Sequence, residues 1–174
     1  MNNAQRIGKS VLIGAVSGLA GAWVMNQYWT VESKLKQQLH PAEHESAQQN
    51  LQQQHQPENP TIEVAQSVSR AMTGHGLRDD DKENAGSAVH YAFGAAMGAL
   101  YGLLSEVAPA TRSGFGLAYA SALWLAADEI MVPALKLSKS PGEYPVSQHL
   151  EGLGAHLLYG ATTEGLRRAL QWAA

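Results

Sequence analysis

Two histidines occupy equivalent positions in two apolar segments of the chain. His90 stands four residues before Gly94 and His156 stands four residues before Gly160, and in both cases an aromatic residue lies between histidine and glycine. Histidine changes its charge near neutral to mildly acidic pH, and its neutral ring binds transition metals. Both residues are therefore candidates for taking up protons or for holding a metal ion.

A pair of acids stands near the end of a third apolar segment. Asp128 and Glu129 precede Pro133, the residue expected to end the helix. Adjacent positions on an α-helix point about 100° apart, so the two carboxylates are not expected to face one partner. Asp128 shares a stripe with Ser121 and Trp124 at spacings of three and four residues. This spacing favours Asp128 as the inward-facing acid.

Four apolar segments must position these residues, and they predict an all-α integral membrane bundle of about four transmembrane helices. The segments cover residues 10–28, 87–107, 114–132 and 149–166. About 20 apolar residues are enough for a helix to cross a bilayer. The mean hydropathy of -0.21 hides these segments because it averages them with a polar, partly helical first loop, residues 31–86. The whole chain, residues 1–174, is predicted to form a single membrane domain.

The first apolar segment follows Arg6 and Lys9, an arrangement that signal peptides share with membrane-spanning helices. Trp23 and Met25 stand where the small residues of a cleavage site would be expected. Residues 10–28 are therefore predicted to remain in the protein as a helix, with aromatic residues at the membrane interface.

The order of the segments places the chemically active residues at one depth. Short connections between long apolar helices make consecutive helices antiparallel, so the second and fourth run in the same direction and the third runs in the opposite one. Four ionisable residues then fall in the same half of the membrane: His90, Asp128, Glu129 and His156. A charge at the bilayer centre costs about 2.5 to 3.5 kcal/mol, so these groups are expected to face the bundle and pair.

The expected pairing within this proton-linked cluster joins His156 to Asp128. Glu129 is expected to mark the boundary with the lipid headgroups, and His149 and Glu151 lie nearer the surface on the same side.

Glycine spacing favours a membrane bundle over a soluble one. The glycines at spacings of four residues are Gly14 and Gly18 in the first segment and Gly94, Gly98 and Gly102 in the second. In water a glycine inside a helix costs about 1 kcal/mol relative to alanine. In lipid such glycines let two helix backbones approach closely. A soluble helical bundle is the alternative, because the apolar segments also contain acids and histidines.

The polar loop contains one amphipathic stretch. Residues 61–72 place apolar side chains on one helical face and stop at Gly74, which predicts a short helix lying on the membrane or on the bundle. Residues 31–60 are expected to form a solvated helix or a loop. Within them, the segment His40-Pro-Ala-Glu43-His44 has histidines at helical spacing, but Pro41 favours a chance match over a metal site.

Composition excludes several classes of function. A net charge of -3 with scattered basic residues gives no surface for nucleic acid, and the lack of cysteine excludes disulfides and thiolate metal sites. The chain has no nucleophile elbow, phosphate loop or dinucleotide fingerprint. An ordinary soluble enzyme is therefore not expected, and neither is a cofactor.

Three stretches combine a His-Tyr start, a Trp-acid-acid-Pro end and a His-x-x-Tyr-Gly motif. They are ENAGSAVHYAFGAAMGALYGLLSE, GFGLAYASALWLAADEIMVPALKLS and HLEGLGAHLLYGATTEGLRR. Together they resemble the YagU-like family of uncharacterised bacterial inner-membrane proteins. The resemblance implies a multi-pass protein of the bacterial inner membrane and, at most, an association with tolerance of acid stress, and it assigns no enzymatic activity. The Gln-rich stretch 48–56 departs from the first loop expected of that family.

Three hypotheses remain open. The first is a non-enzymatic bundle whose His/carboxylate cluster senses or relays protons and supports acid or envelope stress tolerance. The second is a metal-binding membrane enzyme or carrier that uses His90, His156 and Asp128, although no HExxH motif anchors it. The third is an assembly subunit of a larger membrane complex. The expected partners are the lipid bilayer and either another membrane protein or a second copy of the chain.

Overall fold

A computed structural model describes residues 2–39 and 59–173 of the chain. Within these residues all regular secondary structure is helical, and no strand is present. The α-helices are α1 (Asn3–Leu39), α3 (Pro60–Thr73), α4 (Asp79–Val107), α5 (Leu117–Trp124), α6 (Val132–Ala134) and α7 (Val146–Ala173). A π-helix, η2 (Leu125–Met131), joins α5 to α6, and two short 3-10 turns are η1 (Pro109–Arg112) and η3 (Pro141–Glu143).

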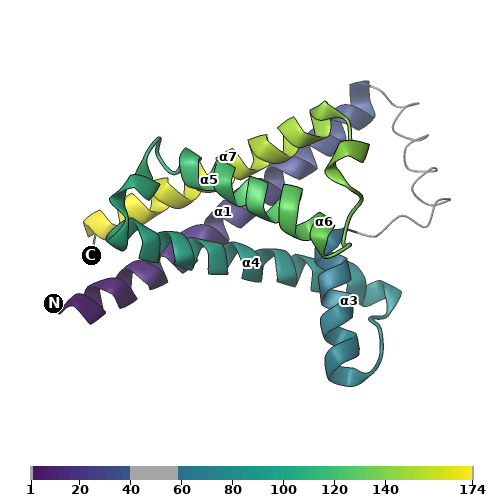
Figure 1. The fold of residues 1–174 in the computed structure, drawn as a ribbon, viewed down its shortest axis with the longest axis horizontal. Coiled ribbons are helices and arrows are strands. Elements are labelled where there is room, and N and C mark those ends of the chain that lie inside the picture. Colours follow the sequence, from purple (N-terminus) through teal and green to yellow (C-terminus); the bar gives the residue numbers. More distant parts are fainter. Residues whose placement is uncertain (1, 40–58, 174) are drawn as a thin grey trace.

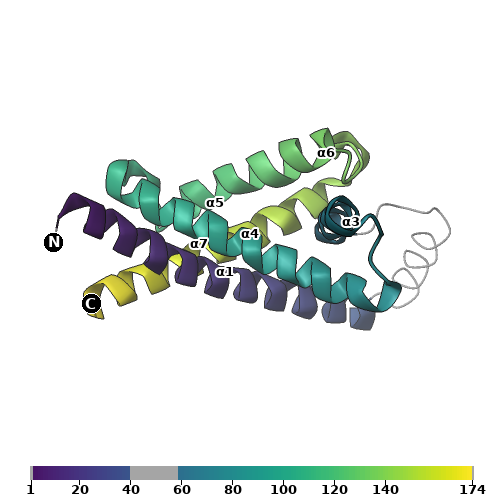
Figure 2. The same cartoon turned by 90° about the horizontal axis from the view of Figure 1, so that it is seen from below.

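The long helices run in alternate directions, and both ends of the chain lie at the same end of the molecule (Figure 1). Helix α1 packs along α4 and α7, while α5 packs along α7 and α3 packs against α4. Figure 2 shows α5 and α6 on one side of the molecule and α1 on the opposite side. This alternation is the one expected from the short connections between the apolar segments.

Three of the long helices extend beyond their apolar segments. Helix α1 continues past residue 28 to Leu39, where Lys36 forms ion pairs with Glu32 and with Glu151 of α7. Helix α4 begins at Asp79 rather than at residue 87, because three acids in its first turn interact favourably with the positive end of the helix dipole. Helix α7 runs to Ala173, beyond the predicted end at residue 166.

The amphipathic helix expected at residues 61–72 is present as α3. The Asn59 side chain accepts a hydrogen bond from the backbone N–H of Thr61, which caps the start of the helix. Gly74 ends it with a φ of 77°, a left-handed conformation that suits glycine. Ile62 packs against Gly86, so α3 lies on the first turns of α4.

The side chains are distributed in an unusual way for a soluble bundle. Among the described residues, no leucine, isoleucine, valine or phenylalanine is buried. Apart from Met25, the buried side chains are small, aromatic or polar: Ser10, Ser17, Ala22, Ala65, Gln66, Tyr101, Ser105, Ala120, Ala127, Ala155, His156, Tyr159, Thr163, Glu164 and Arg167. Large apolar side chains lie instead on the outside of the bundle.

Helix α1 shows this inversion clearly. Its outer stripe consists of Leu12, Val16, Leu19 and Trp23, which are 70%, 54%, 42% and 56% exposed. Its inner stripe consists of Ser10, Gly14, Ser17, Gly18, Gly21, Ala22 and Met25, all of which are buried. The helix therefore turns its small and polar face inward and its large apolar face outward.

Glycines bring α1 and α4 into backbone contact. A Cβ atom added at Gly14 would overlap the carbonyl oxygen of Gly98, and one added at Gly18 would overlap that of Gly94. A Cβ added at Gly98 would lie 2.6 Å from the Cα atom of Gly18. At Gly102 it would overlap the carbonyl oxygen of Ser10. No side chain separates the two helices along this stripe, which is the geometry that small-residue spacing permits.

Within the described residues, α1 alone is long and apolar enough to cross a membrane by length and composition. One helix of this kind does not distinguish a membrane protein from a soluble protein with an apolar core helix. Acids, histidines and arginines lower the hydropathy of α7, and a π-helix interrupts the segment 117–134. Of the four transmembrane helices predicted from the sequence, only α1 is long and apolar enough in the described residues to span a membrane.

Candidate functional site

A cleft of about 1010 Å³ is lined by residues of α4, η2 and α7, together with residues of α1 and α3. Its ionisable lining residues are Glu83, His90, Tyr91, Asp128, Glu129, Tyr144, His149, His156 and Tyr159. The cleft therefore contains all four residues of the predicted cluster. It also contains His149, which was expected nearer the surface.

His156 and Asp128 face each other across α7 and η2. The Nδ1 atom of His156 lies 3.6 Å from Oδ2 of Asp128 and 3.0 Å from the carbonyl oxygen of Gly152. Because both neighbours are acceptors, Nδ1 carries a hydrogen. In the neutral ring, Nε2 is then the atom that can accept a proton. The His156 side chain is only 7% exposed, whereas that of Asp128 is 43% exposed.

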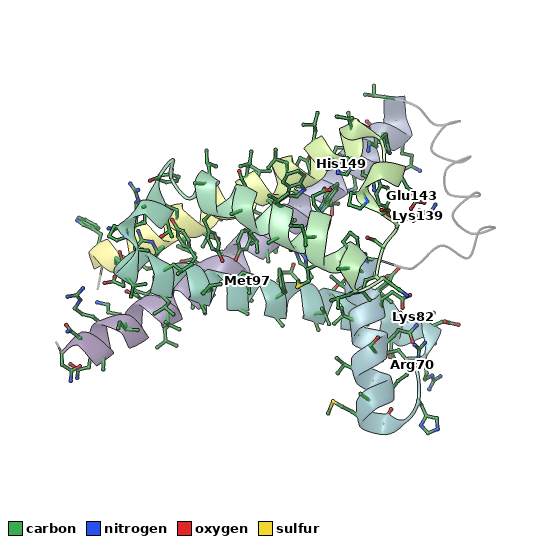
Figure 3. All side chains as sticks on the ribbon, viewed as in Figure 1. Arg70, Lys82, Met97, Lys139, Glu143 and His149 are labelled. Carbon is green, nitrogen blue, oxygen red and sulfur yellow. The ribbon has the colours of Figure 1, made fainter. Side chains whose placement is uncertain are left out.

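His149 forms a second, tighter pair with Glu129. Its Nδ1 atom lies 2.7 Å from Oε1 of Glu129, and its Nε2 atom lies 3.0 Å from the carbonyl oxygen of Pro141. Both ring nitrogens meet acceptors, an arrangement that fits a charged imidazolium with two donors. Figure 3 shows His149 near the start of α7, beside the segment that carries Lys139 and Glu143.

The π-helix explains why both acids reach α7. Adjacent α-helical residues would point about 100° apart, but the wider π turn rotates consecutive residues by less. His149 and His156 are seven residues apart, so they lie on one face of α7 two turns from each other. Asp128 reaches the deeper histidine and Glu129 the outer one. Sequence analysis placed Glu129 at the boundary with the lipid headgroups and did not predict its ion pair with His149.

His90 lies in the same cleft but without a carboxylate partner. Its Nε2 atom lies 3.2 Å from the carbonyl oxygen of Ala22, so it donates to the backbone of α1. His90 is still close enough to Asp128 to interact with it electrostatically, as are His156 and Glu129. The structure thus pairs His156 with Asp128, pairs Glu129 with His149, and places His90 beside them as a link between α4 and α1.

The described residues contain no group of three histidine, aspartate or glutamate side chains arranged to hold a metal ion. His90, which donates to Ala22, does not join His156 and Asp128 in such a group. The segment 40–44, with its closely spaced histidines, lies outside the described residues.

The structure also contains a cluster of buried charges at the other end of the bundle, which sequence analysis did not predict. Glu164 is fully buried and accepts hydrogen bonds from Arg167 at 2.6 and 3.0 Å, from Arg168 at 2.6 Å and from Tyr101 at 2.9 Å. Arg167 is also buried, with 2% exposed. The spacing of three and four residues between Glu164 and the arginines was a usable signal, since such pairs meet on one helix face.

Two tyrosines tie the helices together at backbone atoms. The Tyr159 hydroxyl on α7 donates to the carbonyl oxygen of Gly94 at 2.7 Å, and the Tyr119 hydroxyl on α5 donates to that of Met97 at 2.8 Å. Both acceptors belong to α4. Met97 is seen at the middle of that helix in Figure 3. These hydrogen bonds fix α5 and α7 against α4.

The fold and the site define an all-helical protein with one long apolar helix and a cleft that contains histidines and carboxylates. The model of a family described as "Protein of unknown function (DUF1440)" matches residues 40–165, and the chain belongs to that uncharacterised family. No named relative ties it to the YagU-like proteins in particular. Neither a curated protein nor a solved structure matches the chain.

Proposed function

We propose that this protein is a non-enzymatic bundle of four transmembrane helices whose cleft takes up and releases protons at the His156–Asp128 pair. The observation that carries the membrane part is the inverted distribution of side chains. A soluble bundle is stabilised mainly by burying large aliphatic side chains, each of which contributes roughly 1.5 to 3 kcal/mol. The described part of this chain buries none of its leucines, isoleucines or valines.

A lipid environment accounts for both faces of the helices. Exposed leucines on α1, η2 and α7, such as Leu12, Leu125 and Leu158, suit contact with acyl chains. Helices cannot associate in lipid through the hydrophobic effect, so close backbone packing and hydrogen bonds between helices take its place. The glycine contacts of α1 with α4 and the tyrosine hydrogen bonds to α4 are of these two kinds.

The proton chemistry rests on His156. A proton that enters the cleft would bind at Nε2, since Nδ1 already holds a hydrogen towards Gly152 and Asp128. The nearby carboxylate of Asp128 would stabilise the positive ring. His149 and Glu129 lie two helical turns nearer the start of α7, roughly 10 Å along its axis. The outer pair would therefore meet protons before the deeper one.

The biological setting of this proposal is the bacterial inner membrane. Histidine titrates in the range that separates neutral from mildly acidic conditions. A bundle whose cleft responds in that range suits a contribution to acid or envelope stress tolerance, which the resemblance to the YagU-like family also implies. No bond-making step is assigned to the cleft.

Coupling between His156 and Asp128 tests the proton part. Asp128→Asn and His156→Gln are each expected to lower thermal stability, and the double variant is expected to lose less than their sum. The expected coupling is about 0.5 to 1.5 kcal/mol, because the 43% exposure of Asp128 leaves the pair partly screened. It should be larger when the imidazole ring is protonated, because the positive ring and the carboxylate then attract each other across the 3.6 Å that separates them.

The measurement is thermal unfolding of the detergent-solubilised variants at neutral and mildly acidic pH. Glu106→Gln combined with His156→Gln provides the control, since Glu106 pairs with Arg6 at the other end of the bundle. That combination is expected to be additive within about 0.5 kcal/mol. Strict additivity of the Asp128 and His156 variants at both pH values would remove the structural basis of the proton proposal.

A further inference from the structure

Asp128 differs from the other acids that pack between helices because no donor binds it. Within the described residues, Glu106, Glu129, Glu151 and Glu164 each accept a hydrogen bond from a side chain of another residue. Asp128 accepts none. The side chain near it that can carry a positive charge is His156, whose Nδ1 atom lies 3.6 Å from Oδ2 of Asp128. Its side chain is 43% exposed, although it lies inside the cleft. The carboxylate thus faces open space.

Aromatic side chains line the cleft that contains Asp128. Trp124 lies one turn before Asp128, and both approach Gly152 of α7: a Cβ atom added there would lie 3.2 Å from Nε1 of Trp124 and 3.8 Å from Oδ2 of Asp128. Other aromatic residues line the same cleft, namely Trp29, Tyr91, Phe93, Tyr144 and Tyr159. Aromatic faces attract cations, and the attraction is strongest for tryptophan.

The charged residues that line the cleft favour a positively charged ligand. Three carboxylates, those of Glu83, Asp128 and Glu129, line the cleft, and no described lysine or arginine does. The histidines are its only basic groups, and His149 is already paired with Glu129. The volume of about 1010 Å³ is at the upper end of what drug-sized ligands occupy.

We infer that the cleft binds a hydrophobic monocation, an organic ammonium or phosphonium ion with an aromatic body, whose charge lies at Asp128 beside Trp124. This inference rests on the proposed function, because it assigns a ligand class to the same cleft. A protonated His156 would neutralise the carboxylate that the cation needs, so the proton and the cation would compete for one acid.

The test uses two ions of the same shape and opposite charge. The full chain is placed in lipid nanodiscs at pH 8, and equilibrium binding of tetraphenylphosphonium and of tetraphenylborate is measured, with binding to empty nanodiscs subtracted. Saturable binding is expected for the phosphonium ion and none for the borate. Asp128→Asn should weaken phosphonium binding about tenfold or more, since it removes a charged partner.

Three further variants make the result specific. Asp128→Glu keeps the charge and should retain binding within a few fold. Asp80→Asn removes an exposed acid at the start of α4, outside the cleft, and should change nothing. His156→Gln removes the one basic side chain that the described residues place within 4 Å of Asp128, so phosphonium binding by this variant should weaken less than binding by the parent when the pH is lowered.

Equal binding of phosphonium to the parent and to Asp128→Asn, or equal binding of the borate, would overturn the inference. Either result would leave the proton proposal standing if the Asp128 and His156 variants still show coupled stability. Loss of that coupling with retained, Asp128-dependent phosphonium binding would instead overturn the proton proposal alone.

Discussion

Replacing Gly98 with leucine is expected to destabilise the bundle by about 3 kcal/mol or more. The Cβ atom alone would lie 2.6 Å from the Cα atom of Gly18 and would overlap the carbonyl oxygen of Gly14. Both obstacles are backbone atoms, so no rotamer change can relieve the contact. Helices α1 and α4 would have to separate, which exposes the polar interior of the bundle.

Gly8→Leu is the matched control for Gly98→Leu. Gly8 lies on α1, and a Cβ atom added there meets no atom within 4 Å. Replacing it should leave stability unchanged or raise it, because a helical glycine costs about 1 kcal/mol relative to better helix formers. Thermal unfolding of the two variants in detergent compares them directly. A Gly98→Leu protein that unfolds at the temperature of the parent would show that α1 and α4 do not pack in this way.

Glu164→Gln is expected to cost about 3 to 5 kcal/mol of stability, the cost of breaking a buried ion pair by removing one partner. The substitution keeps the shape of the side chain but removes its charge. Arg167, which is 2% exposed, would then carry a buried charge without its bidentate acceptor. Tyr101 would also lose a charged acceptor for its hydroxyl hydrogen.

A more exposed ion pair between the same types of side chain provides the comparison. Glu106→Gln removes the partner of Arg6, whose side chain is 56% exposed, and should cost no more than about 1 kcal/mol. Replacing both members of the buried pair, as in Glu164→Gln with Arg167→Met, should recover part of the loss. If Glu164→Gln and Glu106→Gln have equal effects on unfolding, the Glu164 cluster is solvated and does not hold α7 against α4.

The sequence contained enough information for the long helices and for the approach of Asp128 to His156. Apolar length predicted the long helices, and the short connections predicted their alternating directions. These two features place Asp128 and His156 at one level, where the structure brings them to 3.6 Å. The ends of the helices were less predictable, because the polar residues after residue 28 continue α1, where Lys36 forms one ion pair within the helix and one with α7.

The partners of Glu129 and of His90 could not be predicted from the spacing of residues along an α-helix. The π-helix turns Glu129 towards His149, and no sequence pattern used for α-helices predicts that rotation. His90 binds a backbone carbonyl of α1, and backbone acceptors cannot be distinguished from one another in a sequence. Glu164 could have been found from its arginine neighbours, but its contact with Tyr101 depends on the packing of α4 and α7.

Water access to the outer apolar stripe tests the membrane assignment most directly. The chain has no cysteine, so each introduced cysteine is the only thiol. Leu19→Cys and Val16→Cys lie in the middle of the first apolar segment at sites that are 42% and 54% exposed. Leu39→Cys is the matched control on the same helix, at a site that is 64% exposed but lies beyond the segment.

The measurement is labelling with a hydrophilic, charged maleimide in permeabilised native membranes, where the reagent reaches both sides. A lipid-embedded bundle predicts labelling at residue 39 and none at residues 16 and 19 until the protein is denatured, because acyl chains exclude the reagent. Rapid labelling at all three positions would show that the apolar stripe of α1 meets water, and it would contradict the membrane bundle on which the account rests.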